Sequence, residues 1–136
     1  MYINCLRRTT LRHFPLETMW AVSHFIGGNG VMASFIYAFP AFMMKWWEAI
    51  RTGDHAIALA MQDDCSRILK EAILPLASEG FNETALTKAT VDAAGFLKAG
   101  PPRRPSAAVP RSRIAKLRRT FEEKFPQFLQ RPAVAG

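Results

Sequence analysis

Residues 27–40, GGNGVMASFIYAFP, determine how this chain is interpreted, because a glycine cluster leads directly into ten residues without a formal charge. Residues 31–37 form a short apolar run with β-branched and aromatic members, a pattern that favours a buried strand. No other segment of the sequence predicts a strand as clearly. An unpaired buried strand would leave several backbone N–H and C=O groups without partners, at a cost in free energy for each. We therefore expect residues 31–37 either to stay extended and unpaired or to join a neighbouring helix.

The composition fits one globular domain, with 136 residues of which 49% are hydrophobic and 21% charged. Cys5 and Cys65 lie far apart without a CxxC motif or a Cys/His cluster, which argues against a disulfide framework and against a structural zinc site. A reducing, cytoplasmic compartment fits this cysteine usage best. Arg7, Arg8 and Arg12, with no acid among the first sixteen residues, are also typical of an organellar presequence, but no regular amphipathic helix accompanies them.

Most of the remaining chain has the periodicity of amphipathic helices. Residues 17–26 have helical spacing and end at a glycine pair, and residues 40–51 place their apolar side chains on one face before Gly53. Asp54 is expected to cap the next helix, whose apolar stripe continues to Leu76 and is interrupted late by Pro75.

Two further helices follow, separated by a proline-rich segment. Asn82 is expected to cap a helix that runs toward Gly100, with these side chains pointing inward: Leu86, Ala89, Ala93, Phe96 and Leu97. Residues 100–110, GPPRRPSAAVP, contain four prolines and should be extended. The last helix is predicted over residues 111–125, with its inward face formed by Ile114, Leu117, Phe121 and Phe125.

Charge and hydropathy leave two alternatives open. Residues 98–136 hold ten Lys or Arg against two Glu, which could serve a basic binding module. Arg118 and Arg119 precede Glu122 and Glu123 at the spacing of intrahelical ion pairs, however, and no aromatic platform for nucleic acid is present. Residues 19–44 carry no formal charge, as in a small membrane-associated helical protein, but a glycine cluster and Pro40 interrupt them. We expect neither nucleic acid nor membrane as partners.

Three stretches taken in order resemble the C-terminal part of a known enzyme family: GGNGVMAS at residues 27–34, AFPAFMMKWWEAIRTGDHAIALAMQ at 38–62 and ALTKATVDAAGFLKAGPPRRPSAAVP at 85–110. The family is that of dihydrodipicolinate synthase and N-acetylneuraminate lyase. Its members share a glycine-rich turn before the eighth barrel strand, a helix ending in Gly-Asp, and a later Lys-Ala helix followed by a glycine and Arg-Pro. The matching positions here are residues 27–34, 53–54, 88–89, 100 and 104–105.

The resemblance implies a class I, Schiff-base lyase of the aldolase type, which acts on pyruvate-type 2-oxo acids without a cofactor or metal. It implies a mainly α chain with the last helix-strand-helix part of a (β/α)8 TIM barrel over residues 15–52 and a C-terminal helical extension over residues 53–129. The barrel would be incomplete, and residues 1–14 and 130–136 would be an unmatched segment and a tail. A complete barrel needs about 250 residues, so this chain would be a fragment. Family members are commonly homotetramers.

The resemblance also assigns substrate-binding positions. The Schiff-base lysine and the relay tyrosine of the family lie on the sixth and fifth strands, so we assign no catalytic residue here and expect the fragment to be inactive alone. Met32 corresponds to the position whose backbone carbonyl approaches the pyruvate-derived carbon, and Ser34 to a serine that holds a substrate hydroxyl. Glu17 falls where the lyase branch has an Asp, but its neighbour departs from the pattern, so a plain helix-start carboxylate is expected there. Tyr37 replaces a common Asn. None of the six lysines is a good candidate for a Schiff-base nucleophile, and Lys88 is the least unlikely because aliphatic residues flank it.

Overall fold

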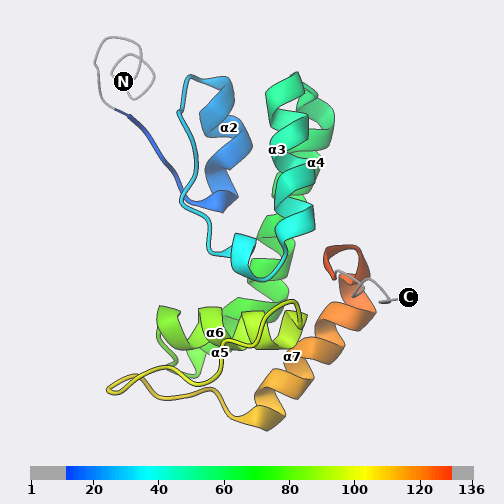
Figure 1. The fold of residues 1–136 in the computed structure, drawn as a ribbon. Helices are drawn as coiled ribbons and strands as arrows, with labels where there is room; N and C mark the ends of the chain where they lie inside the picture. The colour runs from blue at the N-terminus through cyan, green and yellow to red at the C-terminus, as the bar shows by residue number, and fades with distance from the viewer. Residues whose placement is uncertain (1–11, 130–136) are drawn as a thin grey trace. The chain divides into compact units, whose positions relative to one another are not determined.

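The computed structural model describes residues 12–129, and this part of the chain is mainly helical, as predicted. Figure 1 shows the order of the elements. They are the 3-10 helix η1 (Glu17–Met19), α2 (Trp20–Phe25), the 3-10 helix η2 (Phe35–Tyr37), α3 (Pro40–Thr52), α4 (His55–Ile68), the π-helix η3 (Leu69–Ile73), α5 (Leu74–Ser78), α6 (Glu83–Ala94), α7 (Arg111–Lys124) and the 3-10 helix η4 (Pro126–Phe128). The described residues contain no strand and no barrel, so the assignment to a TIM barrel stays a prediction.

These residues form two compact units, which are described separately below. Unit 1 comprises residues 12–34 and 44–66, and unit 2 comprises residues 35–43 and 67–129. Most of the predicted segment 1–14 and the whole tail at 130–136 lie outside the described residues. No helix in the described part of the chain has the combination of length and apolarity needed to span a bilayer.

The strand predicted for residues 31–37 does not form. Met32 makes a single parallel bridge with Leu16, and the chain then turns into η2, where Ala38 N donates to Phe35 O at 3.1 Å. Met32 is 66% exposed rather than buried. The described chain offers this segment only one short partner, since Met32 N donates to Pro15 O, and residues 35–37 form the local turn of η2 instead of extending a sheet. The expectation that residues 31–37 would stay unpaired or join a helix is met only in part, because Met32 pairs with Leu16 while residues 35–37 form η2 outside any regular sheet.

Unit 1 is organised around a tryptophan cluster at the start of α2 and in α3. Trp46 is fully buried, and its Nε1 donates to Ala58 O at 2.9 Å. The Trp20 ring meets the Trp46 ring edge-on with 5.1 Å between centroids, and it lies parallel to the Trp47 ring at 5.9 Å. The periodicity of the sequence predicted α3 because Trp46 and its neighbours at helical spacing had to share one buried face.

The predicted boundary between α3 and α4 is confirmed. Gly53 has φ +76°, a left-handed conformation that a residue with a Cβ adopts only with strain, and it ends α3. Asp54 Oδ1 then accepts a hydrogen bond from Ile57 N at 3.1 Å, which is the geometry of a helix N-cap.

The long helix predicted after Asp54 continues through three elements in direct succession: α4, η3 and α5. Pro75 lies in the first turn of α5. Proline has no N–H, and its ring clashes with the carbonyl four residues earlier in a regular α-helix. The π-helical turn at η3 widens the backbone just before Pro75, which allows the helix to continue past it.

Unit 2 buries a cluster of phenylalanines. The Phe39 ring meets the rings of Phe121 and Phe128 edge-on at 5.4 and 5.5 Å, and Phe42 stacks on Phe128 at 4.1 Å. Phe125, the residue after α7, is also fully buried. The inward face predicted for the last helix is therefore confirmed at Leu117, Phe121 and Phe125.

The helix α6 begins as predicted but ends earlier. Asn82 Oδ1 accepts from Ala85 N at 3.0 Å and caps the helix. Gly95, in a left-handed conformation with φ +79°, ends it after Ala94. The prediction that Phe96 and Leu97 point inward is therefore wrong, since both lie beyond the helix and are about half exposed.

Candidate functional site

Unit 1 contains two short parallel segments joined by a helix. Met32 N donates to Pro15 O at 2.8 Å, and Asn29 N donates to His13 O at 3.0 Å. The Asn29 side chain strengthens this pairing, because its Oδ1 accepts from His13 N at 3.0 Å. Parallel neighbours cannot be joined by a tight turn and need a crossover connection. Here η1 and α2 supply it, and Figure 1 shows α2 beside the extended segment that follows it.

Glu17 and Ser34 lie just after the carboxyl ends of these segments and contact each other. Ser34 Oγ donates to Glu17 Oε1 at 3.0 Å. Glu17 is only 8% exposed, and it forms no ion pair with any residue from 12 to 129. A carboxylate has about four lone-pair sites, so one hydroxyl leaves acceptor capacity unused. The expectation of a plain helix-start carboxylate is correct for the position of Glu17 in η1, but it missed the burial of this side chain and its contact with Ser34.

The side chain of Gln62, on α4, accepts hydrogen bonds from the start of α2, and this role was not predicted from the sequence. Its Oε1 accepts from Ala21 N at 3.0 Å and from Val22 N at 3.4 Å. These N–H groups belong to the first turn of α2, where a helix has no partners of its own for its donors. Gln62 lies beside the apolar stripe of α4, and a polar residue at the border of such a stripe is normally expected to face solvent.

Cys65 lies one helical turn after Gln62 and is fully buried. Burial raises the pKa of its thiol, and the negative charge of Glu17 raises it further. The thiolate is the nucleophilic form of cysteine, so Cys65 is held in its unreactive state.

The other predicted positions are dispersed. Met32 belongs to the parallel bridge and exposes its side chain, and Tyr37 lies at the end of η2, 56% exposed. Lys88 lies on α6 in unit 2, partly buried, and its Nζ donates to Ala99 O at 2.9 Å. The structure thus brings Ser34 and Glu17 into contact, whereas Met32 is connected to this region only through its bridge with Leu16. Within residues 12–129, no three His, Cys, Asp or Glu side chains are arranged to hold a metal ion.

The basic face of α7 is partly neutralised by ion pairs. Arg118 Nε lies 2.9 Å from Glu122 Oε1, which confirms the intrahelical pair predicted from the spacing. Arg113 pairs with Glu79 at 3.2 Å, and Lys124 pairs with Glu71 at 3.2 Å. Several of the charges of α7 are therefore used in ion pairs within unit 2.

Comparison with known proteins adds no assignment: no model of a known protein family matches the chain, and no curated protein matches it.

Proposed function

We propose that this chain is the C-terminal part of a dihydrodipicolinate-synthase-type lyase, in which it supplies one wall of the pocket for a pyruvate-type 2-oxo acid. The observation that carries the proposal is the Glu17–Ser34 hydrogen bond at the carboxyl end of two parallel segments. In (β/α)8 barrels the active site lies at the carboxyl ends of the strands, and neighbouring strands are parallel. The isolated parallel bridge between Leu16 and Met32, with η1 and α2 connecting the two residues, supports the proposal, because successive strands of such a barrel are parallel and joined by a helix.

The chemistry of the pair favours recognition of a hydroxyl group. A carboxylate repels a carboxylate substrate but accepts hydrogen bonds from hydroxyls, and a serine hydroxyl can both donate and accept. A substrate hydroxyl placed between Glu17 and Ser34 could replace or extend their 3.0 Å contact. The backbone of Met32 lies two residues before Ser34, where the resemblance expects a carbonyl close to the pyruvate-derived carbon.

The proposal includes the absence of lyase activity in this chain alone. A Schiff-base lyase needs a nucleophilic amine and a positioned proton relay, which the family carries on barrel strands that precede the matched segments. Of the lysines considered, Lys88 is partly buried and belongs to unit 2, whereas the Glu17–Ser34 pair belongs to unit 1. In the complete enzyme we expect a cytoplasmic homo-oligomer that needs neither cofactor nor metal.

A split-barrel experiment tests the proposal directly. The chain would be coexpressed with the first six strand-helix units of a family lyase, which stop before the two segments that this chain would supply, and turnover of the 2-oxo acid would be measured. We expect activity from the mixture and none from either part. Ser34→Ala and Glu17→Gln should reduce this activity, whereas Ser78→Ala, an exposed serine of unit 2, should not. An inactive mixture in which the two parts nevertheless copurify would contradict the proposal.

Borohydride trapping tests the inactivity of the chain alone. After incubation with pyruvate and borohydride, intact-mass analysis should show no stoichiometric adduct. An adduct on one lysine, abolished when that lysine is replaced by Ala, would show that the chain carries its own Schiff-base amine.

A further inference from the structure

Unit 2 contains a cavity of about 300 Å³ between α6, α7 and the proline-rich segment 100–110. This volume is at the lower end of the range found for sites that bind small molecules. Most of the wall is apolar and is formed by Ala85, Ala89, Pro101, Pro102, Val109 and Ile114. Three charged side chains also line it: Lys88, Asp92 and Arg111.

The two cations of the cavity have donors to spare. Lys88 Nζ uses one of its three N–H groups on Ala99 O, at 2.9 Å, and keeps two. Within the described chain neither Lys88 nor Arg111 forms an ion pair. Lys88 is partly buried, so its charge is screened less than that of a fully exposed lysine.

The backbone adds to this positive character. Arg111 is the first residue of α7, and Pro110 precedes it without a side-chain cap. The N-terminal end of this 14-residue helix, which carries a partial positive charge, therefore lies at the wall of the cavity. Asp92 supplies the one carboxylate, and its Oδ1 accepts from Ala99 N at 2.7 Å and Gly100 N at 3.3 Å. These bonds fix the start of the proline-rich segment as a wall of the cavity.

We propose that this cavity binds a small aliphatic monocarboxylate, with its carboxylate toward Lys88 and Arg111 and its hydrocarbon body against Ala89, Val109 and Ile114. Two cations and one carboxylate leave a single net positive charge, which matches a monoanion better than a phosphate dianion. The apolar wall favours a hydrocarbon body over a fully hydrated inorganic ion. The guanidinium and ammonium groups together can satisfy both carboxylate oxygens. All the residues involved belong to unit 2, so the proposal stands independently of the function proposed for unit 1.

Titration of the whole chain with hexanoate, followed by amide NMR shifts, tests this proposal. We expect saturable shifts at Ala85, Ala89 and Val109. Lys88→Gln and Arg111→Gln should each weaken binding about tenfold, the loss expected for one charge-assisted hydrogen bond. Arg119→Gln is the matched control, because it removes an exposed cation of α7 that does not line the cavity, and it should leave the affinity unchanged.

Two further ligands test separately whether the cavity recognises the hydrocarbon body and the negative charge. Hexan-1-ol has the same hydrocarbon body without the charge, and sulfate has charge without the body. Both should bind at least about tenfold more weakly than hexanoate. Absence of saturable shifts with hexanoate, equal binding by sulfate, or unchanged hexanoate affinity in Lys88→Gln with a native spectrum would each overturn the proposal.

Discussion

Unit 1 and unit 2 both bury aromatic side chains, but they differ in what they leave without a partner. In unit 2 the rings of the phenylalanine cluster are buried against one another, and Asn82 caps α6. The cations Arg113 and Lys124 of α7 form ion pairs with Glu79 and Glu71. In unit 1 three buried polar atoms of α2 have no hydrogen-bond partner in the described chain: Trp20 Nε1, Ser23 Oγ and His24 Nδ1. Native proteins leave few buried polar groups unsatisfied.

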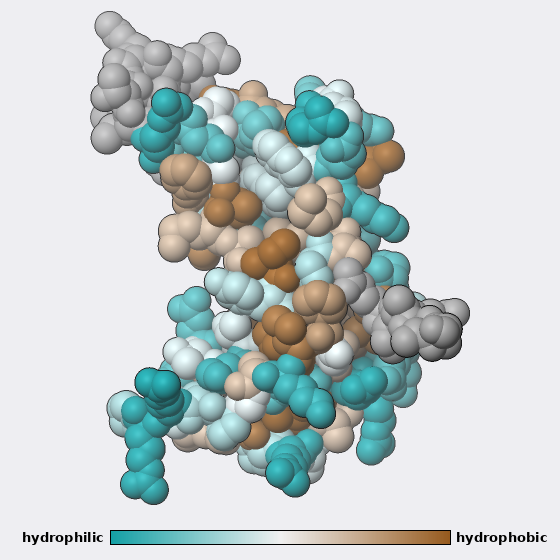
Figure 2. All heavy atoms as spheres, viewed as in Figure 1, coloured by the Kyte–Doolittle hydropathy of each residue, from teal (hydrophilic) through white to brown (hydrophobic). Residues whose placement is uncertain are grey.

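Both units expose large apolar side chains, and in unit 2 these are Tyr37, Leu74, Phe96 and Leu97, each about half exposed. Figure 2 shows apolar side chains reaching the surface among polar ones on the viewed face. In unit 1, Phe14, Leu16, Met19 and Met32 are each at least half exposed, and they lie in or beside the two parallel segments. Exposed apolar side chains commonly mark a surface that meets another segment or partner when they are contiguous. Their position in unit 1 supports the proposal that further barrel strands would pack against this part of unit 1.

The largest expected loss of stability tests whether the phenylalanine cluster forms the core of unit 2. Phe121 is fully buried in the phenylalanine cluster, so Phe121→Ala should lower the free energy of unfolding by about 3–5 kcal/mol. Urea denaturation followed by circular dichroism measures this change. Phe96→Ala is the matched control, because Phe96 is 48% exposed and its removal should cost much less. Similar losses in the two variants would mean that the cluster does not form the core of unit 2.

A pair of substitutions in unit 1 tests whether the buried indole N–H of Trp20 lacks a hydrogen-bond partner. Trp46 and Trp20 are both deeply buried, but only Trp46 has a hydrogen bond from Nε1, to Ala58 O at 2.9 Å. Trp46→Phe should therefore reduce the unfolding free energy by about 1–3 kcal/mol more than Trp20→Phe does, because it removes a buried hydrogen bond, whereas Trp20→Phe removes a buried N–H that has no partner in the described chain. Urea titrations of the two variants measure the difference. Equal losses would show that Trp20 Nε1 does have a partner in solution, which would remove much of the contrast between the units.

Local signals in the sequence were sufficient for most of the helices. The stripe through Phe42 and Trp46 predicted α3, and the caps Asp54 and Asn82 were identified because a short polar side chain precedes an apolar period. The end of α6 was missed because two glycines, Gly95 and Gly100, were both suitable stops, and only the tertiary environment decides which one is used.

The candidate site was predicted only in part, and through resemblance rather than periodicity. Ser34 and Met32 were named, but the contact of Ser34 with Glu17 joins residues 17 positions apart, and no local pattern encodes it. The bridge between Leu16 and Met32 was missed for the same reason, since Leu16 had no strand pattern of its own. Gln62 acts across 41 residues, on Ala21 N. Such long-range contacts depend on the packing of α4 against α2, which the sequence of either helix alone does not specify.

The pH dependence of stability offers a smaller effect in unit 1. Burial, and then Glu17, raises the pKa of the Cys65 thiol in the folded chain, whereas the unfolded thiol should titrate near its ordinary value of about 8.5. Stability from this group is complete below about pH 8.5 and is lost as the pH rises, because only the unfolded chain then releases the proton. Between pH 8 and pH 10 the wild type should lose about 2 kcal/mol more unfolding free energy than Cys65→Ala. Parallel pH profiles of the two proteins would contradict the burial of this thiol.

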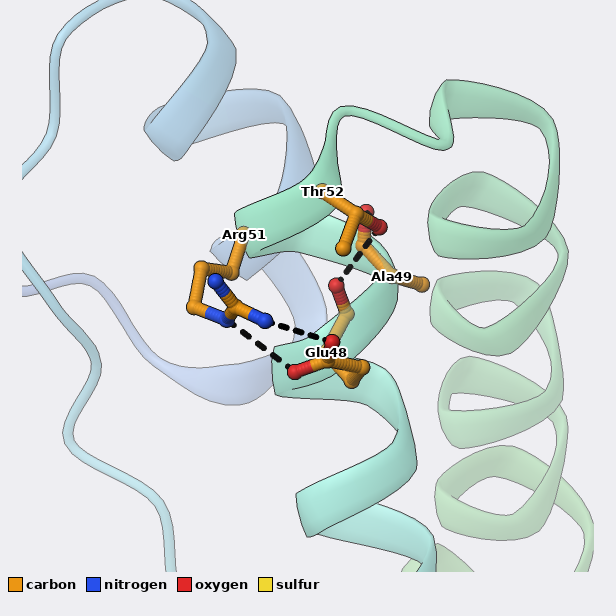
Figure 3. Close-up of polar contacts among 4 residues, drawn as sticks. All are labelled: Glu48, Ala49, Arg51 and Thr52. Atoms are coloured by element: carbon orange, nitrogen blue, oxygen red, sulfur yellow. Dashed lines mark hydrogen bonds and ion pairs between the residues drawn. The ribbon is translucent and has the colours of Figure 1, made fainter.

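The smallest expected effect concerns the exposed ion pair of α3, in which both side chains are more than half exposed (Figure 3). Arg51 Nε and Nη2 donate to Glu48 Oε2 and Oε1 at 3.0 and 2.6 Å. The hydrogen bond from Arg51 lowers the pKa of Glu48, so any stabilisation is present above about pH 4.3 and is lost as the pH falls through the lowered value. Water and salt screen this pair, and we expect Arg51→Ala to leave the thermal midpoint unchanged within error at neutral pH, at pH 3 and in 1 M salt.

The neighbouring Thr52→Ala is the control for that measurement, because Thr52 Oγ1 donates to Glu48 O at 2.8 Å and belongs to the same exposed turn without carrying charge (Figure 3). A midpoint that falls in Arg51→Ala but not in Thr52→Ala, and only at low salt, would show that surface charge stabilises unit 1. The contrast between the units would then have to include their ion pairs. If both midpoints stay unchanged, the difference between the units lies in their buried groups alone. Unit 2 buries a cluster of packed phenylalanine rings, whereas α2 in unit 1 buries polar atoms without hydrogen-bond partners in the described chain.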